Sequence, residues 1–143
     1  DVPAGLAAVQ AGKADTVSRD AIALSCHFLE SRYDCADFYA IGLLALLYRN
    51  QERATPIMTS DDQQRIENAL RGFKFWLDEP GLDAMCYFTE NHQILFHVTA
   101  YLAGQRWPDR VFANTGWAGK HQMRRNRSRN AAAPSNSITL RRR

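Results

Sequence analysis

The sequence predicts an all-α fold built from tandem helical hairpins. Four apolar runs recur at helical spacing, capping or turn residues bound each run, and no stretch shows the alternation of a strand. The 143 residues, of which 45% are hydrophobic and 23% charged, suffice for one modest core. We expect three parts: an irregular N-terminal segment at 1–15, helical hairpins at 16–121, and a basic disordered tail at 122–143.

The first two helices are predicted from their apolar spacing. The first should run from about Thr16 to Ser31, and the second should begin at Asp37 and follow the run from Phe38 to Tyr48. That run is apolar on all sides, so the second helix must be packed on several faces. Because four helices in an isolated bundle offer few neighbours, we expect further neighbours from a longer protein and interpret the chain as a fragment.

The third helix is expected to begin at Thr59 or Ser60, because Thr and Ser cap helices and two aspartates follow in the first turn. Its end is set by Pro80-Gly81, since proline disfavours a helical residue before it and Pro-Gly favours a turn. The residues expected on its buried side are Ile66, Leu70, Phe73 and Leu77.

Thr89 is the predicted cap of a fourth helix that runs from Glu90 to about Gln105. At about 100° per residue, five positions share one stripe, and apolar residues occupy the flanks and back. The stripe consists of Glu90, Gln93, His97, Tyr101 and Gly104. We expect this helix to be mostly buried, and burying an unpaired polar group costs about 1 to 3 kcal/mol. We therefore expect Glu90, Asn91, Gln93, His97 and Tyr101 to border one concave surface, with the loop from Asn114 to His121 close enough to cover it.

Charge is distributed unevenly along the chain. Residues 120–143 hold eight of the eighteen basic residues and no acidic one, which leaves a net charge of −5 on residues 1–119. An acidic body does not offer the basic face of a nucleic-acid-binding domain, so no specific nucleic-acid partner is expected. No apolar run approaches the roughly 20 residues that span a bilayer, so no membrane segment is expected either. The compartment is not indicated.

Three cysteines without a CxxC pair argue against a disulfide framework, and we interpret them as small core residues. No cofactor is expected, and no metal site is predicted from local spacing. His92 and His97 are five residues apart, about 140° around a helix, which prevents both from binding one ion.

Two stretches carry a resemblance to a known group of proteins. Gly72–Gly81 and Thr89–His97, followed by Tyr101–Gln105, resemble a largely uncharacterised microbial (α/α)-toroid family with an aromatic-Ser/Thr-Glu-Asn-His-Gln helix start. Its Gly-rich loop ending in His is matched by Gly116 to His121, so the resemblance covers roughly residues 18–121. It implies a fragment of an (α/α)6 toroid, a ring of helical hairpins that houses many glycoside hydrolases and polysaccharide lyases.

The resemblance implies roles for individual residues. Asn91-His92 is similar, as a dipeptide, to a pair in alginate-lyase-like and heparinase-like toroids, where Asn neutralises a uronate carboxylate and His helps proton transfer. The expected catalytic residues are Glu90, His92 and His97, with Glu90 as the acid/base. The expected substrate-binding residues are Asn91, Gln93, Tyr101, Trp117 and His121. The alternative is purely structural: Glu90 would stabilise the helix start, and the histidines would be hydrogen-bonded packing residues.

Two functions follow from these observations. The first is a carbohydrate-active enzyme fragment, a glycoside hydrolase or polysaccharide lyase, with hydrolysis and elimination both open. The second is a non-catalytic helical-repeat scaffold or binding module, or an inactive truncated product. In either case exposed apolar helix faces would favour self-association.

Overall fold

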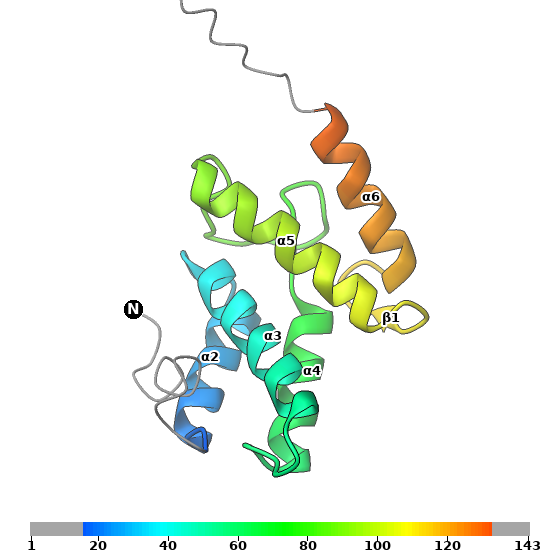
Figure 1. Ribbon diagram of the computed structural model, residues 1–143. Helices are drawn as coiled ribbons and strands as arrows, with labels where there is room; N and C mark the ends of the chain where they lie inside the picture. The colour runs from blue at the N-terminus through cyan, green and yellow to red at the C-terminus, as the bar shows by residue number, and fades with distance from the viewer. Residues whose placement is uncertain (1–15, 133–143) are drawn as a thin grey trace, which may run out of the picture.

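The computed structural model describes residues 16–132, where helices dominate (Figure 1). In chain order the elements are α2 (Arg19–Ser31), α3 (Ala36–Glu52), α4 (Ser60–Gly72), α5 (Glu90–Arg106), β1 (Val111–Phe112), β2 (Trp117–Ala118) and α6 (Gly119–Ala132). The all-α prediction is confirmed as a fold class, since the strands in this part of the chain are two residues long. The expectations for residues 1–15 and 133–143 lie outside the described residues.

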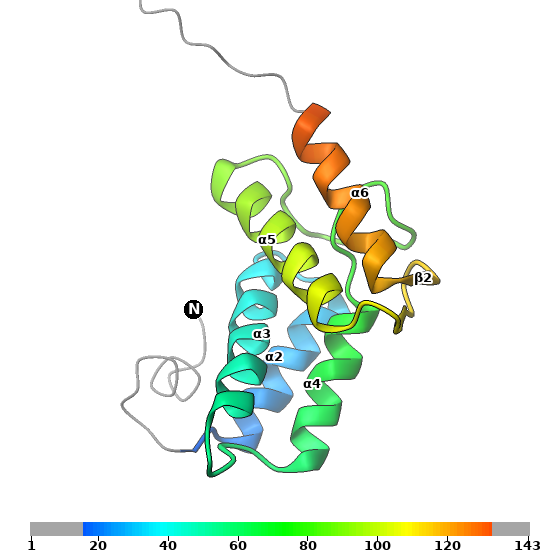
Figure 2. The ribbon, with the colours of Figure 1, turned by 45° about the vertical axis from the view of Figure 1, so that its right-hand side comes forward.

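Three helices form a layer, and a fourth helix crosses it. Helices α2, α3 and α4 lie side by side, α5 crosses one end of that layer, and α6 packs on the other side of α5 (Figure 2). Helix α3 contacts α2, α4 and α5, whereas α5 contacts chiefly α3 and α6.

Helix α3 is covered on most sides, as its apolar sequence predicts. Its buried residues are Ala36, Asp37, Tyr39, Ala40, Gly42, Leu43, Leu44, Leu46 and Leu47. The helices that cover it all belong to this chain. Ala45 and Phe38 on α3 nevertheless remain exposed, so the expectation of further neighbours from a longer protein stays a prediction.

Helix α2 begins three residues later than predicted and ends at Ser31 as predicted. Arg32 follows in the left-handed region, at φ 51°, and its backbone N–H donates to the carbonyl of Leu29 to close the helix. The Arg32 guanidinium reaches across the fold and donates to Asn114 Oδ1 at 2.6 Å. The segment after α2 is thus tied to the segment before β2.

Helix α4 ends at Gly72, earlier than predicted. Thr59 caps its start as expected, with the side chain accepting from the Asp62 N–H at 3.2 Å. The backbone is extended at Phe73, so Phe73 and Phe75 both reach the core, and Leu77 is exposed rather than buried. Helical spacing predicted a longer α4 with Phe73 and Leu77 on its buried side. The chain is instead extended after Gly72, and the buried residues there are Phe73 and Phe75, two positions apart.

Helix α5 has the predicted bounds and the predicted cap, since Thr89 Oγ1 accepts from the His92 N–H at 3.4 Å. The expectation that it is mostly buried was wrong. Ile94 is 60% exposed and Val98 is 42% exposed. The buried face consists of Phe96, Thr99, Ala100, Ala103 and Gly104. Among the described helices, α3 and α6 make the main contacts with α5, and apolar side chains on its other faces are exposed.

The predicted Gly-rich loop contains a short hairpin. Strands β1 and β2 pair antiparallel, and Phe112 lies opposite Trp117. Gly116 has φ 72°, and its N–H donates to the Phe112 carbonyl at 2.8 Å, so the turn requires the left-handed conformation that glycine adopts freely. Gly119 is already the first residue of α6.

Helix α6 overturns part of the predicted disordered tail, because residues 122–132 are helical. Gln122 is buried and donates from Nε2 to Glu79 Oε1 at 2.7 Å. Arg125 pairs with Asp78 at 2.6 Å and lies 4.4 Å above the Trp117 ring. Polar contacts attach this helix to the rest of the fold. The prediction of disorder considered only apolar side chains and therefore missed them.

None of the described helices is both long and apolar enough to cross a membrane.

Candidate functional site

The structure places the predicted site residues in two separate regions. Glu90, Asn91 and Gln93 are exposed on the first turn of α5, whereas Trp117 and His121 belong to β2 and α6. The start of α6 contacts α5 at Gly104, where an added Cβ would lie 2.5 Å from the Gly119 carbonyl oxygen. Gly104 is about 21 Å along the helix from Glu90 at 1.5 Å per residue. The loop therefore does not cover the first turn, and the described residues do not form the single concave surface we expected.

The polar stripe of α5 changes character along the helix. Gln93 is exposed and donates from Nε2 to the Phe88 carbonyl at 3.4 Å. His97 and Tyr101 are half-buried, and the His97 ring lies 4.3 Å from the Trp76 ring at an interplanar angle of 30°. Only the N-terminal part of the stripe is thus open to a ligand.

His92 is the best-supported member of the predicted set, because a buried carboxylate orients it. Its Nδ1 lies 2.8 Å from Asp37 Oδ2, and the two side chains are 12% and 1% exposed. Phe38 packs edge-on against the imidazole, with centroids 5.5 Å apart. A carboxylate accepts from the ring, so Nδ1 is the donor, and in the neutral form of the ring Nε2 has the free lone pair.

Asp37 was missed as a site residue. It begins an apolar run, and an Asp there is typical of a helix start, so the sequence carried no signal that it would be buried. Burial raises the pKa of Asp37 above its usual range, while the hydrogen bond and charge of His92 oppose the rise. Its second oxygen, Oδ1, is buried without a hydrogen bond from any described residue.

Asp34 and Cys35 lie beside His92, although 57 residues separate Cys35 from it. One ligand atom from each of the three side chains lies within 4.8 Å of the others. Asp34 Oδ1 accepts from the N–H of Cys35 at 3.0 Å and of Cys86 at 3.3 Å. Burial, together with the charges of Asp34 and Asp37, raises the pKa of the Cys35 thiol.

The cysteines do not all have the predicted role. Cys26 is a buried core residue, as expected, and burial raises its pKa to about 11. Cys35 is exposed, and it caps α3 in the left-handed region at φ 64°. It is therefore not packed in the core.

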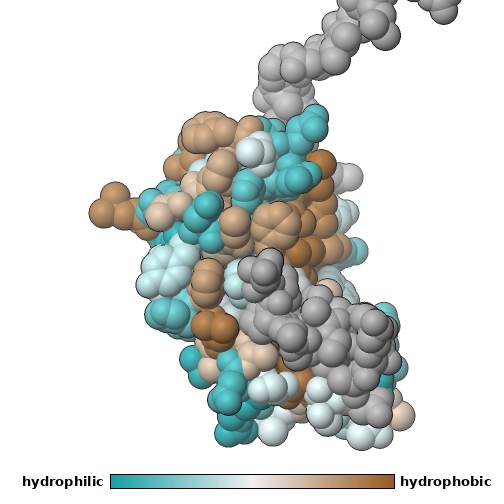
Figure 3. Space-filling view, turned by 90° about the vertical axis from the view of Figure 1, so that its left-hand side faces the viewer, coloured by the Kyte–Doolittle hydropathy of each residue, from teal (hydrophilic) through white to brown (hydrophobic). Residues whose placement is uncertain are grey.

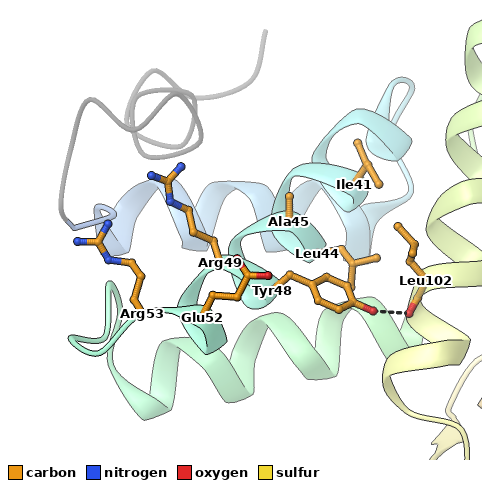
Figure 4. Close-up of a pocket in the computed structure, with 8 residues that line it drawn as sticks. All are labelled: Ile41, Leu44, Ala45, Tyr48, Arg49, Glu52, Arg53 and Leu102. Atoms are coloured by element: carbon orange, nitrogen blue, oxygen red, sulfur yellow. Dashed lines mark hydrogen bonds between the residues drawn. The ribbon is translucent and has the colours of Figure 1, made fainter.

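A groove of about 700 Å³ runs between α3 and α5 (Figure 4). Tyr48 lies across it and donates from its hydroxyl to the Leu102 carbonyl at 3.1 Å. The other lining residues are Ile41, Leu44 and Ala45, with Arg49, Glu52 and Arg53 at one end. The groove is apolar with a charged end.

A smaller hollow of about 190 Å³ lies near the first turn of α5, bordered by Phe38, Asn91, Ile94 and Leu95. Figure 3 shows hydrophobic residues, in brown, gathered among hydrophilic ones in the upper half of this face of the molecule. Exposed apolar side chains thus border the turn that carries Glu90 and Asn91.

No protein-family model, curated protein or solved structure matches this chain significantly. The toroid resemblance thus stays a prediction.

Proposed function

We propose that this chain is part of a carbohydrate-active enzyme of the (α/α)-toroid class, and that the first turn of α5 contacts the sugar. One observation carries the proposal: Phe88 is 81% exposed directly beside exposed Glu90, Asn91 and Gln93. A sugar has an apolar ring face and a rim of hydroxyl groups. An open aromatic ring next to a carboxylate and two amides offers a matching surface for both.

The turn is held in place by three contacts, which favours a binding role. Thr89 caps the helix, Gln93 returns a hydrogen bond to the Phe88 carbonyl, and His92 is bonded to buried Asp37. A preorganised surface loses less conformational entropy when a ligand binds. In this proposal His92 is a positioning residue that fixes the turn through Asp37.

The proposed reaction is elimination, because the carboxyls near the turn other than Glu90 already have partners. Asp37 pairs with His92, and Asp34 accepts from the N–H groups of Cys35 and Cys86. Candidates in the loop before α5 have other partners: Asp78 pairs with Arg125, Glu79 accepts from Gln122, and Asp83 pairs with Lys74. Elimination from a uronate needs one base to remove the proton beside the carboxylate and a group that neutralises the carboxylate. A carbon–carbon double bond then forms as the glycosidic C–O bond breaks, and the departing oxygen takes a proton from the protonated base or from water. Glu90 would be that base, and Asn91 would bind the carboxylate.

Turnover of acidic and neutral polysaccharides by the full chain tests this proposal. Glu90→Gln should abolish release of unsaturated product and keep the fold, because it removes the titratable group at constant size. Phe88→Ala and Asn91→Ala should weaken oligouronate binding about tenfold each. Leu82→Ala, at a 97% exposed apolar side chain outside the turn, is the matched control and should change nothing. Undiminished turnover by Glu90→Gln, or equal behaviour of Phe88→Ala and Leu82→Ala, would contradict the proposal.

A second candidate function is favoured by the groove between α3 and α5. An open apolar groove with a charged end suits a helical hairpin of another copy of this chain, which fits the scaffold alternative. Ala45→Arg would place a charge on the groove wall, where Ala45 is exposed. Sedimentation should then show loss of self-association in Ala45→Arg but not in Leu82→Arg. A monomeric wild-type chain would exclude this candidate and leave the carbohydrate proposal intact.

A further inference from the structure

The connection between α2 and α3 meets the first turn of α5 at a cluster of metal-binding groups. Asp34 and Cys35 come from the connection, and His92 comes from α5. A carboxylate oxygen, a thiol sulfur and an imidazole nitrogen lie within 4.8 Å of one another. Around a tetrahedral zinc ion the ligand atoms are about 3.3 to 3.8 Å apart, given bond lengths of about 2.0 to 2.3 Å. Small side-chain rotations would therefore bring the three groups to bonding distance.

We propose that Asp34, Cys35 and His92 bind a single divalent metal ion of the zinc class, with a fourth position open to solvent. Mixed sulfur, nitrogen and oxygen donors suit zinc and its spectroscopic substitute cobalt better than magnesium or calcium, which prefer oxygen donors alone. Three protein ligands with one open position are the arrangement of reactive rather than purely structural zinc sites.

The hydrogen bonds around the cluster orient each ligand for this task. Asp37 lies 2.8 Å from His92 Nδ1 and can hold a proton on that nitrogen, which leaves the Nε2 lone pair of the neutral ring available to a metal ion. Both hydrogen bonds to the Asp34 carboxylate go to Oδ1, from the N–H groups of Cys35 and Cys86. Asp34 Oδ2 is left for a ligand, since no described residue donates to it.

Charge and access also fit a cation. Asp34 and buried Asp37 concentrate negative charge around the thiol. A divalent cation would compensate these carboxylates. Asp34 and Cys35 are exposed, so an ion can enter from solvent without local unfolding.

The inference goes beyond the proposed function and does not depend on it, because it concerns binding of the ion alone. Cobalt titration of the full chain, followed by optical spectroscopy, is the direct test. We expect one Co²⁺ per chain with a sulfur-to-metal charge-transfer band, and displacement of the cobalt by Zn²⁺. Cys35→Ala should abolish the band, and His92→Ala should weaken binding at least a hundredfold. Circular dichroism shows whether each variant keeps its helices.

Matched controls separate this site from chance binding. Cys86→Ala removes a neighbouring thiol and His121→Ala removes an exposed imidazole on α6, and both should bind cobalt as wild type does. Asp37→Asn should keep the band but lower the affinity about 10- to 100-fold, because it weakens the orienting hydrogen bond. A band that survives Cys35→Ala, disappears in Cys86→Ala, or is never formed by wild type would overturn the proposal. Unchanged affinity in Asp37→Asn would remove Asp37 from it.

Discussion

Helices α3 and α5 have the same length, 17 residues, but different burial. Nine residues of α3 are buried and five of α5, and α5 exposes Ile94 and Val98. Helix α3 lies between α2, α4 and α5, whereas α5 lies at the edge of the layer with α3 on one side and α6 along its C-terminal part. The first turn of α5 is consequently open.

The comparison shows that the number of neighbouring helices, rather than apolar content, decides how much of a helix is buried. A helix covered on three sides supplies the core and can bury a carboxylate such as Asp37. A helix at the edge can present that carboxylate's partner, His92, next to solvent. The candidate site is formed where the buried helix and the edge helix meet.

The largest expected effect is a difference in unfolding free energy between variants of α3 and variants of α5. Leu46→Ala on α3 should lower the free energy of unfolding by about 3 kcal/mol, since Leu46 is fully buried and the change leaves a cavity. Ile94→Ala on α5 removes a mostly exposed side chain and should cost less than about 1 kcal/mol. Urea denaturation of both variants checks this. Equal losses would mean that α5 is covered as thoroughly as α3.

A close backbone approach fastens α6 to the covered half of α5. A Cβ at position 119 would lie 2.1 Å from the Trp107 carbonyl oxygen, so Gly119→Ala must push two backbone segments apart. We expect a loss of about 2 to 3 kcal/mol and faster amide exchange in α6. Gly72→Ala, where nothing lies within 4 Å, is the matched control and should be neutral or slightly stabilising. Unchanged exchange in Gly119→Ala would show that α6 does not pack at this point.

Buried Glu79 links α6 to the segment before α5. It accepts from the Phe75 N–H at 2.9 Å and from Gln122 Nε2 at 2.7 Å. Glu79→Ala should cost about 2 kcal/mol because buried donors lose their acceptor, and Glu79→Gln should cost less. The exposed neighbour Asp78 pairs with Arg125 near the surface, so Asp78→Ala should cost under about 1 kcal/mol. Thermal unfolding would reveal any reversal of this order.

The smallest expected effect is the pH dependence of stability that buried Cys26 contributes. Cys26 lies within the α2–α4 layer with a pKa of about 11, against an ordinary 9.0. Between these values the unfolded chain loses the thiol proton before the folded chain does, so stability must fall as pH rises from 9 to 11, by on the order of 1 to 2 kcal/mol. Cys26→Ala should lose that extra pH dependence, measured by urea unfolding at pH 8 and pH 10.5. A slope identical to that of wild type would argue against a buried thiol.

Thiol labelling of the native chain at pH 8 provides a second readout for the cysteines. Exposed Cys35 should react within minutes, and Cys26 only as fast as the chain unfolds. Rapid labelling of Cys26 would show that the layer opens locally.

The sequence by itself determined the helix positions that depend on nearby residues. The caps Thr59 and Thr89 and the end at Ser31 follow from groups within about one helical turn, so no distant contact was needed. The prediction of helices without a sheet over residues 16–105 is confirmed for the same reason. The sequence identified the first turn of α5 as chemically distinct. It did not predict that this turn is exposed to solvent.

The tertiary structure alone decided which helix is covered and which side chains meet. Asp37 and His92 are 55 residues apart, and Gln122 binds Glu79 across 43 residues. Helix α6 forms because such distant polar partners are present, although its own sequence offers little to bury. Local spacing fixes how a segment can fold, whereas burial and pairing depend on the neighbours that the whole chain brings to it.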